Sequence, residues 1–239
     1  MMCYDVSAQI RNRRWECQQS HLQCSKGGAG KTTSAILLAT ELKAAGTTVA
    51  VIDADPAARL LKWSERAETK NPVHVIKSNG EKAILDEIEA LSSEYAFLPI
   101  DLEGSASRLS SYAIGEFDLV IVPSGEEQQD AEEAIATLTE VEREGRTRRR
   151  TISAVVLFCR TNAAVKSKLE KHINKEVSAA TKVLETQLHR RTAFSSLHNY
   201  GGGLRDLDPN DVNGIDKAIQ SAEQFAAEVV DLLKEGQNE

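Results

Sequence analysis

The sequence contains little of what stabilises small extracellular proteins. It has 4 cysteines in 239 residues, and no two of them form a C-x-x-C pair. That spacing provides neither a disulfide framework nor a zinc site and favours reduced thiols in the cytosol. No apolar run approaches the ~18 residues of a membrane span, and no apolar segment follows the N-terminal arginines, so no signal peptide is visible. We therefore expect a cytoplasmic protein.

The chain also lacks an excess of positive charge. Its formal net charge is −7, with 27% charged and 41% hydrophobic residues. This excludes a uniformly basic surface, so any binding to nucleic acid must depend on a local patch. A chain of this length can bury an ample core in one large domain. We assign that domain to residues 21–239 and treat residues 1–20, which are polar and unpatterned, as a disordered or non-native extension.

The run S-K-G-G-A-G-K-T-T at residues 25–33 is typical of a phosphate-binding loop. Glycines allow backbone N–H groups to turn inward around phosphate oxygens, and a helix beginning near Gly30 directs its positive end at the same anion. Lys31 would reach the β- and γ-phosphates, and the Thr32 hydroxyl would bind Mg²⁺. Because a helical pattern and an apolar strand follow, a chance glycine-rich turn is the weaker interpretation. The residues expected to bind nucleotide here are Lys26, Gly27, Gly28, Ala29, Gly30, Lys31, Thr32 and Thr33.

Helical and strand patterns alternate along the rest of the chain, which predicts an α/β fold: a doubly wound, mostly parallel sheet with helices on both faces. Buried strands are expected at residues 47–52, 95–100, 119–122 and 152–158. Pro99 lies within one of them and indicates an edge strand or a bulge, because proline cannot donate to a strand ladder. Residues 181–199 have no clear pattern.

Three aspartates follow the predicted strands. Asp53 and Asp55 lie in V-I-D-A-D-P, and Asp101 follows F-L-P-I. Ligands of open α/β sheets bind beyond the carboxyl ends of the strands, so these carboxylates are expected near the phosphate loop. Asp55 could instead cap a helix that begins at Pro56. The order of loop and carboxylates suits phosphoryl transfer to water.

The deviant pattern K-G-G-x-G-K-T-T, together with D-x-D-P, resembles the ParA/MinD group of P-loop ATPases. The segment D-L-E-G-S-A-S looks like small plasmid-type ParA proteins, including the ParA-like protein of T-DNA transfer. The resemblance implies ATP and Mg²⁺ as cofactors. It also implies that Lys26 reaches the partner's nucleotide in an ATP-bound homodimer and that Asp55 orients the attacking water.

The same resemblance places Asp53 near the Mg²⁺ shell. Asp101, as the Walker B carboxylate, would hold the metal through water. Asn162, in the R-T-N that follows a strand, lies where the family often contacts the base.

For function, the resemblance implies partition of a plasmid or chromosome on the nucleoid. The ATP-bound dimer would bind DNA non-specifically, and a ParB-like centromere-binding protein would stimulate hydrolysis. Arginine suits phosphate recognition, although a solvated turn is an equal alternative for such a cluster. The candidate DNA-binding residues are Arg146, Arg148, Arg149 and Arg150.

Three alternatives to partition follow from the same fold. Positioning of a protein or DNA-transfer complex remains open, and a metabolic P-loop enzyme is less favoured. Membrane positioning needs a basic amphipathic helix, whereas residues 215–239 carry two lysines and six acidic residues. Because anionic lipid repels an acidic face, no membrane partner is expected.

Overall fold

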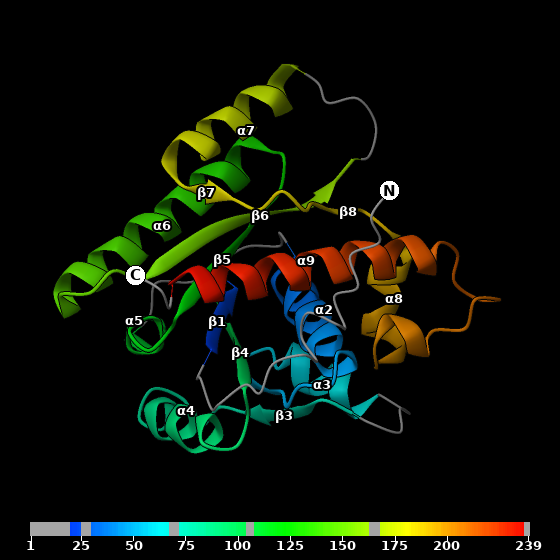
Figure 1. Cartoon of the computed structure of the whole chain (residues 1–239), viewed down its shortest axis with the longest axis horizontal. Helices are drawn as coiled ribbons and strands as arrows, with labels where there is room; N and C mark the ends of the chain where they lie inside the picture. Colours follow the sequence, from blue (N-terminus) through cyan, green and yellow to red (C-terminus); the bar gives the residue numbers. More distant parts are fainter. Residues whose placement is uncertain (1–19, 25–29, 67–71, 104–107, 163–167, 237–239) are drawn as a thin grey trace.

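The computed structural model describes residues 20–24, 30–66, 72–103, 108–162 and 168–236. Within these ranges a parallel sheet forms the centre of the molecule, and helices lie on both of its sides (Figure 1). This is the doubly wound α/β fold that the alternating pattern predicts.

The sheet has the strand order β3-β2-β4-β1-β5-β6-β7, and β8 pairs with β6. All the recorded pairings are parallel. The strand that enters the phosphate loop, β1, therefore lies in the interior of the sheet between β4 and β5. The strands are β1 (Ser20–Cys24), β2 (Ala50–Ala54), β3 (His74–Lys77), β4 (Phe97–Leu102), β5 (Leu119–Ser124), β6 (Ser153–Thr161), β7 (Lys182–Val183) and β8 (Leu188–His189).

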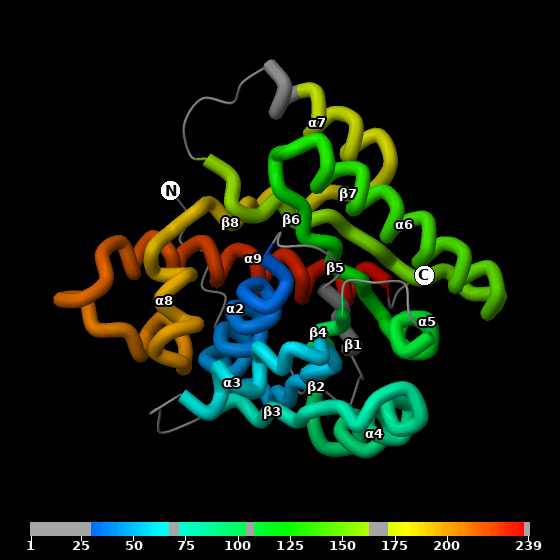
Figure 2. Tube along the Cα trace, turned by 180° about the vertical axis from the view of Figure 1, so that it is seen from behind, coloured from blue at the N-terminus to red at the C-terminus, as the bar shows by residue number. Residues whose placement is uncertain are grey.

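Helices connect the strands and cover the sheet, as the trace seen from behind also shows (Figure 2). The described helices are α2 (Lys31–Ala44), α3 (Arg59–Glu65), α4 (Ile84–Ser92), α5 (Arg108–Ile114), α6 (Gln128–Arg148), α7 (Lys168–Ala180), α8 (Thr192–Tyr200) and α9 (Ile215–Gly236), with a 3₁₀ turn at Leu204–Asp206. No helix in the described ranges is long and apolar enough to cross a membrane.

Two hydrophobic cores lie on opposite faces of the sheet. One packs α2, α3, α8 and α9 against the sheet, and Leu37 and Phe225 are fully buried in it. The other packs α4, α5, α6 and α7 against the opposite face, around residues such as Ile88 and Phe117. β5 is buried along its whole length. Strands that are buried on both faces have nearly continuous apolar sequences, which explains the apolar run in β5.

Pro99 corrects one expectation about the sheet. β4 is an interior strand between β2 and β1, not an edge strand. The β2–β4 pairing is recorded from Ile52 and Ile100 onward, with an isolated bridge between Val49 and Phe97 before it. The recorded pairing is thus interrupted on the β2 side around Pro99, where an interior strand can accommodate a missing donor.

Two further boundaries differ from the sequence pattern. Helix α3 begins at Arg59 and not at Pro56, and its N-cap residue Ala58 has a left-handed φ of 49°. The unpatterned stretch after residue 180 forms the two-residue strands β7 and β8 and then α8. Strands of two residues are too short to show a hydrophobic period, which is why the pattern did not reveal them.

Candidate functional site

The candidate site lies where α2 begins and where β2 and β4 end. Asp53 in β2 and Asp101 in β4 are direct neighbours across the two paired strands. The sequence expectation that parallel strands bring these carboxylates together is therefore met by the geometry. Residues 26–29 of the phosphate loop, which include the predicted Lys26, Gly27, Gly28 and Ala29, lie outside the described residues.

Gly30 is the N-cap of α2 and has a φ of 106°. A Cβ atom added there would lie 3.2 Å from the Cβ of Cys159 at the end of β6. Both the left-handed backbone and the close approach favour glycine. Gly30 thus allows the start of α2, with the buried Lys31 and Thr32, to pack tightly against β6.

Thr32 and Asp101 form the centre of the site. The Thr32 hydroxyl donates a hydrogen bond of 2.9 Å to Oδ2 of Asp101. Oδ1 of Asp101 is buried and has no hydrogen-bond partner among the described residues. Burial raises the pKa of Asp101 to about 7, and the neighbouring charge of Asp53 acts in the same direction. A buried oxygen without a partner beside a hydroxyl suits a hard cation such as Mg²⁺, so the residues present fit this metal.

Asp53 is also fully buried, but its carboxylate is already engaged. Oδ1 accepts the N–H of Asp55 at 3.1 Å, and Oδ2 accepts the N–H of Leu61 at 2.9 Å. Lys77 from β3 lies 3.6 Å from Oδ1. In this arrangement Asp53 fixes the path of the chain from β2 into α3. That Asp53 also lies near bound Mg²⁺ stays a prediction.

Asp55 follows β2 and is 6% exposed. Its Oδ1 accepts the N–H of Ala57 at 2.8 Å, and its Oδ2 accepts a hydrogen bond of 2.9 Å from Arg59. The Lys77 ammonium donates to the backbone carbonyl of Asp55. Asp55 therefore caps a local turn and does not cap α3 itself, which begins four residues later.

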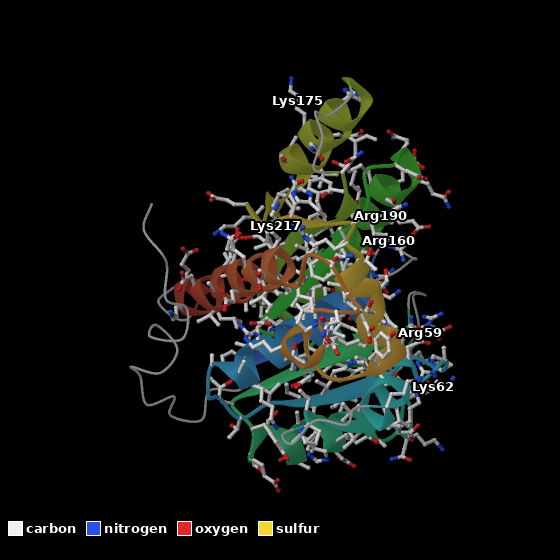
Figure 3. All side chains as sticks on the ribbon, turned by 90° about the vertical axis from the view of Figure 1, so that its right-hand side faces the viewer. Arg59, Lys62, Arg160, Lys175, Arg190 and Lys217 are labelled. Atoms are coloured by element: carbon white, nitrogen blue, oxygen red, sulfur yellow. The ribbon has the colours of Figure 1, made fainter. Side chains whose placement is uncertain are left out.

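A cavity of about 450 Å³ opens beside Gly30 and Thr33. Its walls include Arg160, Arg190 and Arg191, together with two histidines. Figure 3 shows Arg160 and Arg190 on the same side of the molecule as Arg59. A cavity this basic beside a phosphate loop suits an anionic ligand.

Each of the two histidines in this cavity joins two elements. Thr33 Oγ1 lies 2.8 Å from Nε2 of His198 on α8, and Thr161 Oγ1 lies 2.6 Å from Nδ1 of His189.

Asn162, predicted to contact a base, directly follows β6, and its N–H donates to the Glu126 carboxylate at 3.1 Å.

The four arginines predicted to bind DNA lie at the end of α6 and just after it. Arg146 is paired with Glu142. Arg148 donates to the carbonyl of Ser111 at 2.9 Å, and Arg150 donates to the carbonyl of Phe117. Arg149 caps the helix with a left-handed φ of 56° and is exposed.

The arginines at 148 and 150 thus link α6 to the end of α5 and the segment after it. Arg146, Arg149 and Arg150 line a surface groove with Thr181. The predicted cluster therefore combines Arg148 and Arg150, which donate to backbone carbonyls, with Arg146, which is paired with Glu142, and the exposed Arg149.

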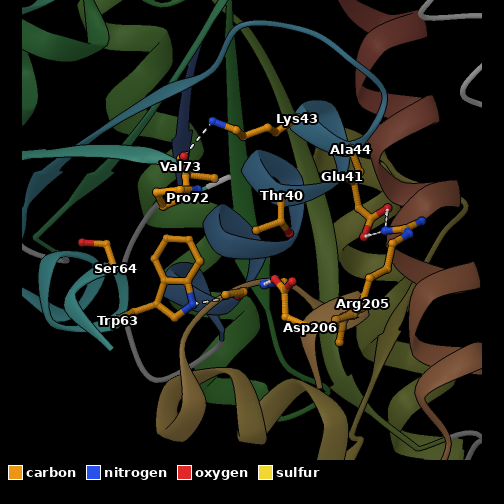
Figure 4. A pocket seen from close by; sticks show the side chains of 13 residues that line it. Thr40, Glu41, Lys43, Ala44, Trp63, Ser64, Pro72, Val73, Arg205 and Asp206 are labelled. Carbon is orange, nitrogen blue, oxygen red and sulfur yellow. Dashed lines mark hydrogen bonds and ion pairs between the residues drawn. The ribbon is translucent and has the colours of Figure 1, made fainter. Parts of the chain in front are cut away.

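A second, smaller cavity of about 180 Å³ lies at the far end of α2 (Figure 4). Trp63 forms one wall and donates its indole N–H to the carbonyl of Gly202 at 3.0 Å. Glu41 accepts two bonds of 2.7 Å from Arg205, and Lys43 donates to the carbonyl of Pro72 at 2.6 Å. These donors and acceptors are hydrogen-bonded to one another. We therefore assign no ligand to the described residues that line this cavity.

Sequence reasoning did not assign site roles to Arg59, Lys77 or His198. Neither Lys77 nor His198 belongs to a motif in the sequence. Their contacts join segments up to 165 residues apart. The one local signal was Arg59, which lies four residues after Asp55 and so can pair with it.

Comparison with known proteins identifies relatives of this chain. The model of the VirC1 protein family matches residues 21–213. A protein named ParA from Rhizobium radiobacter is 32% identical over 212 residues, which are 88% of this chain and 95% of that protein. The virC1 protein of the same organism is 29% identical over 186 residues, which cover 74% of this chain and 79% of the relative.

Solved structures share the fold. The septum site-determining protein MinD from Pyrococcus horikoshii, complexed with Mg-ADP, superposes with a TM-score of 0.68 at 14% identity, covering 92% of this chain and 99% of the other. A ParA family ATPase from Chlorobium tepidum superposes with a TM-score of 0.64 at 13% identity, covering 88% and 98%. At these identities the similarity concerns the P-loop NTPase fold alone.

Proposed function

The chain belongs to the VirC1 protein family and has the fold of ParA-like P-loop ATPases, and from this we propose that it hydrolyses ATP to ADP and phosphate with Mg²⁺ as cofactor. The observation that carries the proposal is the Thr32–Asp101 pair with the buried, unpartnered Oδ1 of Asp101. A bound Mg²⁺ would neutralise charge on the phosphates. Thr32 lies in the first turn of α2, directly after the sequence of the phosphate loop, and Asp101 lies near the end of β4.

We assign the following roles to the residues of the site, as the sequence motifs predict. Residues 27–30 and Thr33 cradle phosphate with their backbone N–H groups, and Lys31 neutralises its charge. Thr32 and Asp101 hold the metal, and Asp53 supports them from its fixed position between β2 and α3. Asp55 orients the attacking water.

The rest of the nucleotide extends toward the basic cavity beside Thr33, and Asn162, which directly follows β6, contacts the base. We assign Lys26 to the partner's nucleotide in an ATP-bound homodimer.

The biological role that we propose for this ATPase is partition of DNA. The ATP-bound dimer binds DNA non-specifically on the nucleoid, and a ParB-like centromere-binding protein stimulates hydrolysis and release. Arg146 and Arg149 are the best-placed contacts to phosphate, because they line an open groove, whereas Arg150, which also lines it, donates to the carbonyl of Phe117. Arg148 and Arg150 support that surface through their bonds to carbonyl oxygens.

A binding experiment tests the ATPase proposal first. Isothermal titration of the full chain with ATP should show binding that is much tighter with Mg²⁺ than with EDTA. The Lys31→Ala variant should lose this affinity, because the point charge on the phosphates is removed. The Lys26→Ala variant should bind ATP normally as a monomer but should not form the dimer. ATP affinity retained in Lys31→Ala would contradict the phosphate-cradle assignment.

The partition role is tested by DNA binding with ATP, ADP or no nucleotide at two salt concentrations. We expect binding only with ATP, independent of DNA sequence and weaker at the higher salt. The match to the VirC1 family favours a second role, positioning of a DNA-transfer complex. An ATP-dependent dimer that fails to bind non-specific DNA would favour that second role over partition.

A further inference from the structure

Asp55 is the residue to which the proposed function assigns the attacking water, and each of its carboxylate oxygens already accepts a hydrogen bond. One accepts the N–H of Ala57, and the other accepts the Arg59 guanidinium. A carboxylate that orients water must direct a lone pair at that water. Each oxygen has two lone pairs, but the bound guanidinium takes one lone pair of Oδ2 and weakens that oxygen as an acceptor for water.

The two bonds differ in how readily they can be given up. The bond from Ala57 belongs to the backbone of a tight turn, in which the N–H of Ala58 also donates to the Asp55 carbonyl at 2.9 Å. The bond from Arg59 comes from a long side chain that is 60% exposed. An exposed ion pair contributes little net stability, so solvent or an incoming anion can replace it. Release of Arg59 is the easier way to make an Asp55 oxygen a stronger acceptor for water.

The backbone before Arg59 determines where its side chain lies relative to Asp55. Ala58 has a φ of 49°, a left-handed conformation that alanine rarely adopts. Helix α3 begins at the next residue, Arg59. Arg59 follows Asp55 by four positions, and its guanidinium reaches the Asp55 carboxylate. Strain of this kind at a loop beside a candidate active site is typical of a segment held for function.

Lys77 makes a different contact with the same loop. Its ammonium donates to the Asp55 backbone carbonyl and lies 3.6 Å from the Asp53 carboxylate. It therefore restrains the backbone of the loop and leaves the Asp55 carboxylate to Arg59. The two cations have separate roles, and only the one at position 59 competes with water for Asp55.

We propose that Arg59 is a positioning residue that restrains hydrolysis by pairing with the carboxylate of Asp55, so that turnover is faster when this ion pair is open. This inference rests on the proposed ATPase function. Because Arg59 does not contact residues 30–33 through any recorded bond, its removal should change the rate of the chemical step and not the affinity for ATP.

The test is single-turnover hydrolysis of radiolabelled ATP with excess full-length protein and Mg²⁺, alongside ATP affinity by titration. Arg59→Ala and Arg59→Gln should both raise the rate by about three- to fivefold, the size expected for loss of an exposed ion pair. Arg59→Lys, which can still pair with Asp55, should stay close to the starting protein. Arg143→Ala is the matched control, because Arg143 is an arginine of similar exposure, paired with glutamates on α6.

Two further variants separate failure of this inference from failure of the proposed function. Asp55→Asn should bind ATP but not hydrolyse it, and the double variant Arg59→Ala/Asp55→Asn should be equally inactive. A rate in both Arg59→Ala and Arg59→Gln that is equal to or below that of the starting protein would overturn the restraint alone. Full activity in Asp55→Asn would instead refute the role of Asp55 in the proposed function, and the restraint with it.

Discussion

His198 on α8 and Thr33 in the first turn of α2 are joined by a hydrogen bond of 2.8 Å between Nε2 and Oγ1. The backbone carbonyl of His198 in turn accepts a bond from Arg66, just past the end of α3. His198 therefore connects α8 with α2 and with the end of α3, on one face of the sheet and close to the phosphate loop. Its partial burial, together with its basic surroundings, determines how it responds to acid.

The first prediction concerns this histidine. Burial lowers the pKa of His198 below its usual value of 6.5, and Arg160, Arg59 and Arg66 act in the same direction. The unfolded chain thus takes up the proton more readily, so this contribution to stability is present above about pH 6.5 and is lost as the pH falls below it. Urea unfolding at about pH 7.5 and about pH 5 should show a smaller acid loss in His198→Gln than in the starting protein. An equal loss in both would contradict the prediction.

Asp101 gives a second prediction, with the opposite dependence on pH. Its pKa is raised to about 7, mainly by burial. The folded state therefore holds the proton more tightly, and stability falls as the pH rises from about 4 to about 7. Without metal, Asp101→Asn should be more stable than the starting protein near neutral pH, by an amount on the order of 2–4 kcal/mol.

The same substitution should abolish the Mg²⁺ dependence of ATP binding, because it removes the metal-binding carboxylate. Thermal unfolding with and without Mg-ATP measures both effects. An Asn variant that is less stable than the starting protein at neutral pH would show that the buried carboxylate is stabilising, contrary to this prediction.

The third prediction separates backbone strain from crowding at Gly30. Gly30→Ala should destabilise the fold and weaken nucleotide binding, because an alanine there has an unfavourable φ and meets Cys159. Gly46 offers a matched control, since its φ is 91° but nothing lies within 4 Å of an added Cβ. We expect Gly46→Ala to cost about 1 kcal/mol and Gly30→Ala clearly more. Equal losses in urea unfolding would mean that strain alone makes glycine necessary.

A fourth prediction concerns the buried Glu41 carboxylate. Arg205 donates to both of its oxygens and also to Glu223. Burial nevertheless raises the pKa of Glu41. Arg205→Met should destabilise the protein by about 3 kcal/mol, because it leaves a buried charge without its partner. Adding Glu41→Leu should restore much of that loss, and a double variant as unstable as Arg205→Met would contradict this.

The fifth prediction divides the arginine cluster into two pairs. Arg146→Ala/Arg149→Ala should keep its stability but flatten the salt dependence of DNA binding, with a change in slope of about two. Arg148→Ala/Arg150→Ala should lower the melting temperature, because the carbonyls of Ser111 and Phe117 lose donors. An unchanged slope in the first pair would indicate that the groove is only a solvated turn.

The sequence predicted the sheet and much of the candidate site because both depend on local patterns. Apolar runs followed by aspartate located Asp53 and Asp101 at the same edge of the sheet, and the glycine-rich run located Gly30 at the start of a helix. Pro99 misled the prediction for a physical reason. Its missing donor matters only on one side of a strand, and the interruption of pairing with β2 leaves the pairing with β1 in place.

Contacts between distant side chains could not be predicted in this way. Nothing near His198 in the sequence indicates that α8 packs beside Thr33, and nothing near Lys77 shows that β3 pairs with β2. These contacts follow from the strand order and the packing of helices, which a hydrophobic period does not specify. Arg148 and Arg150 show the same limit, because a basic run looks alike whether its guanidinium groups face solvent or bind carbonyl oxygens.

The position of Trp63 gives the protein an internal optical reporter. This indole is 2% exposed, lies on the short helix α3 that begins with Arg59, and is bonded to the carbonyl of Gly202. The chain has only one other tryptophan, Trp15, so a Trp15→Phe variant would fluoresce from α3 alone. Stopped-flow emission after mixing with nucleotide would then follow the movement of this helix in real time, without any attached dye.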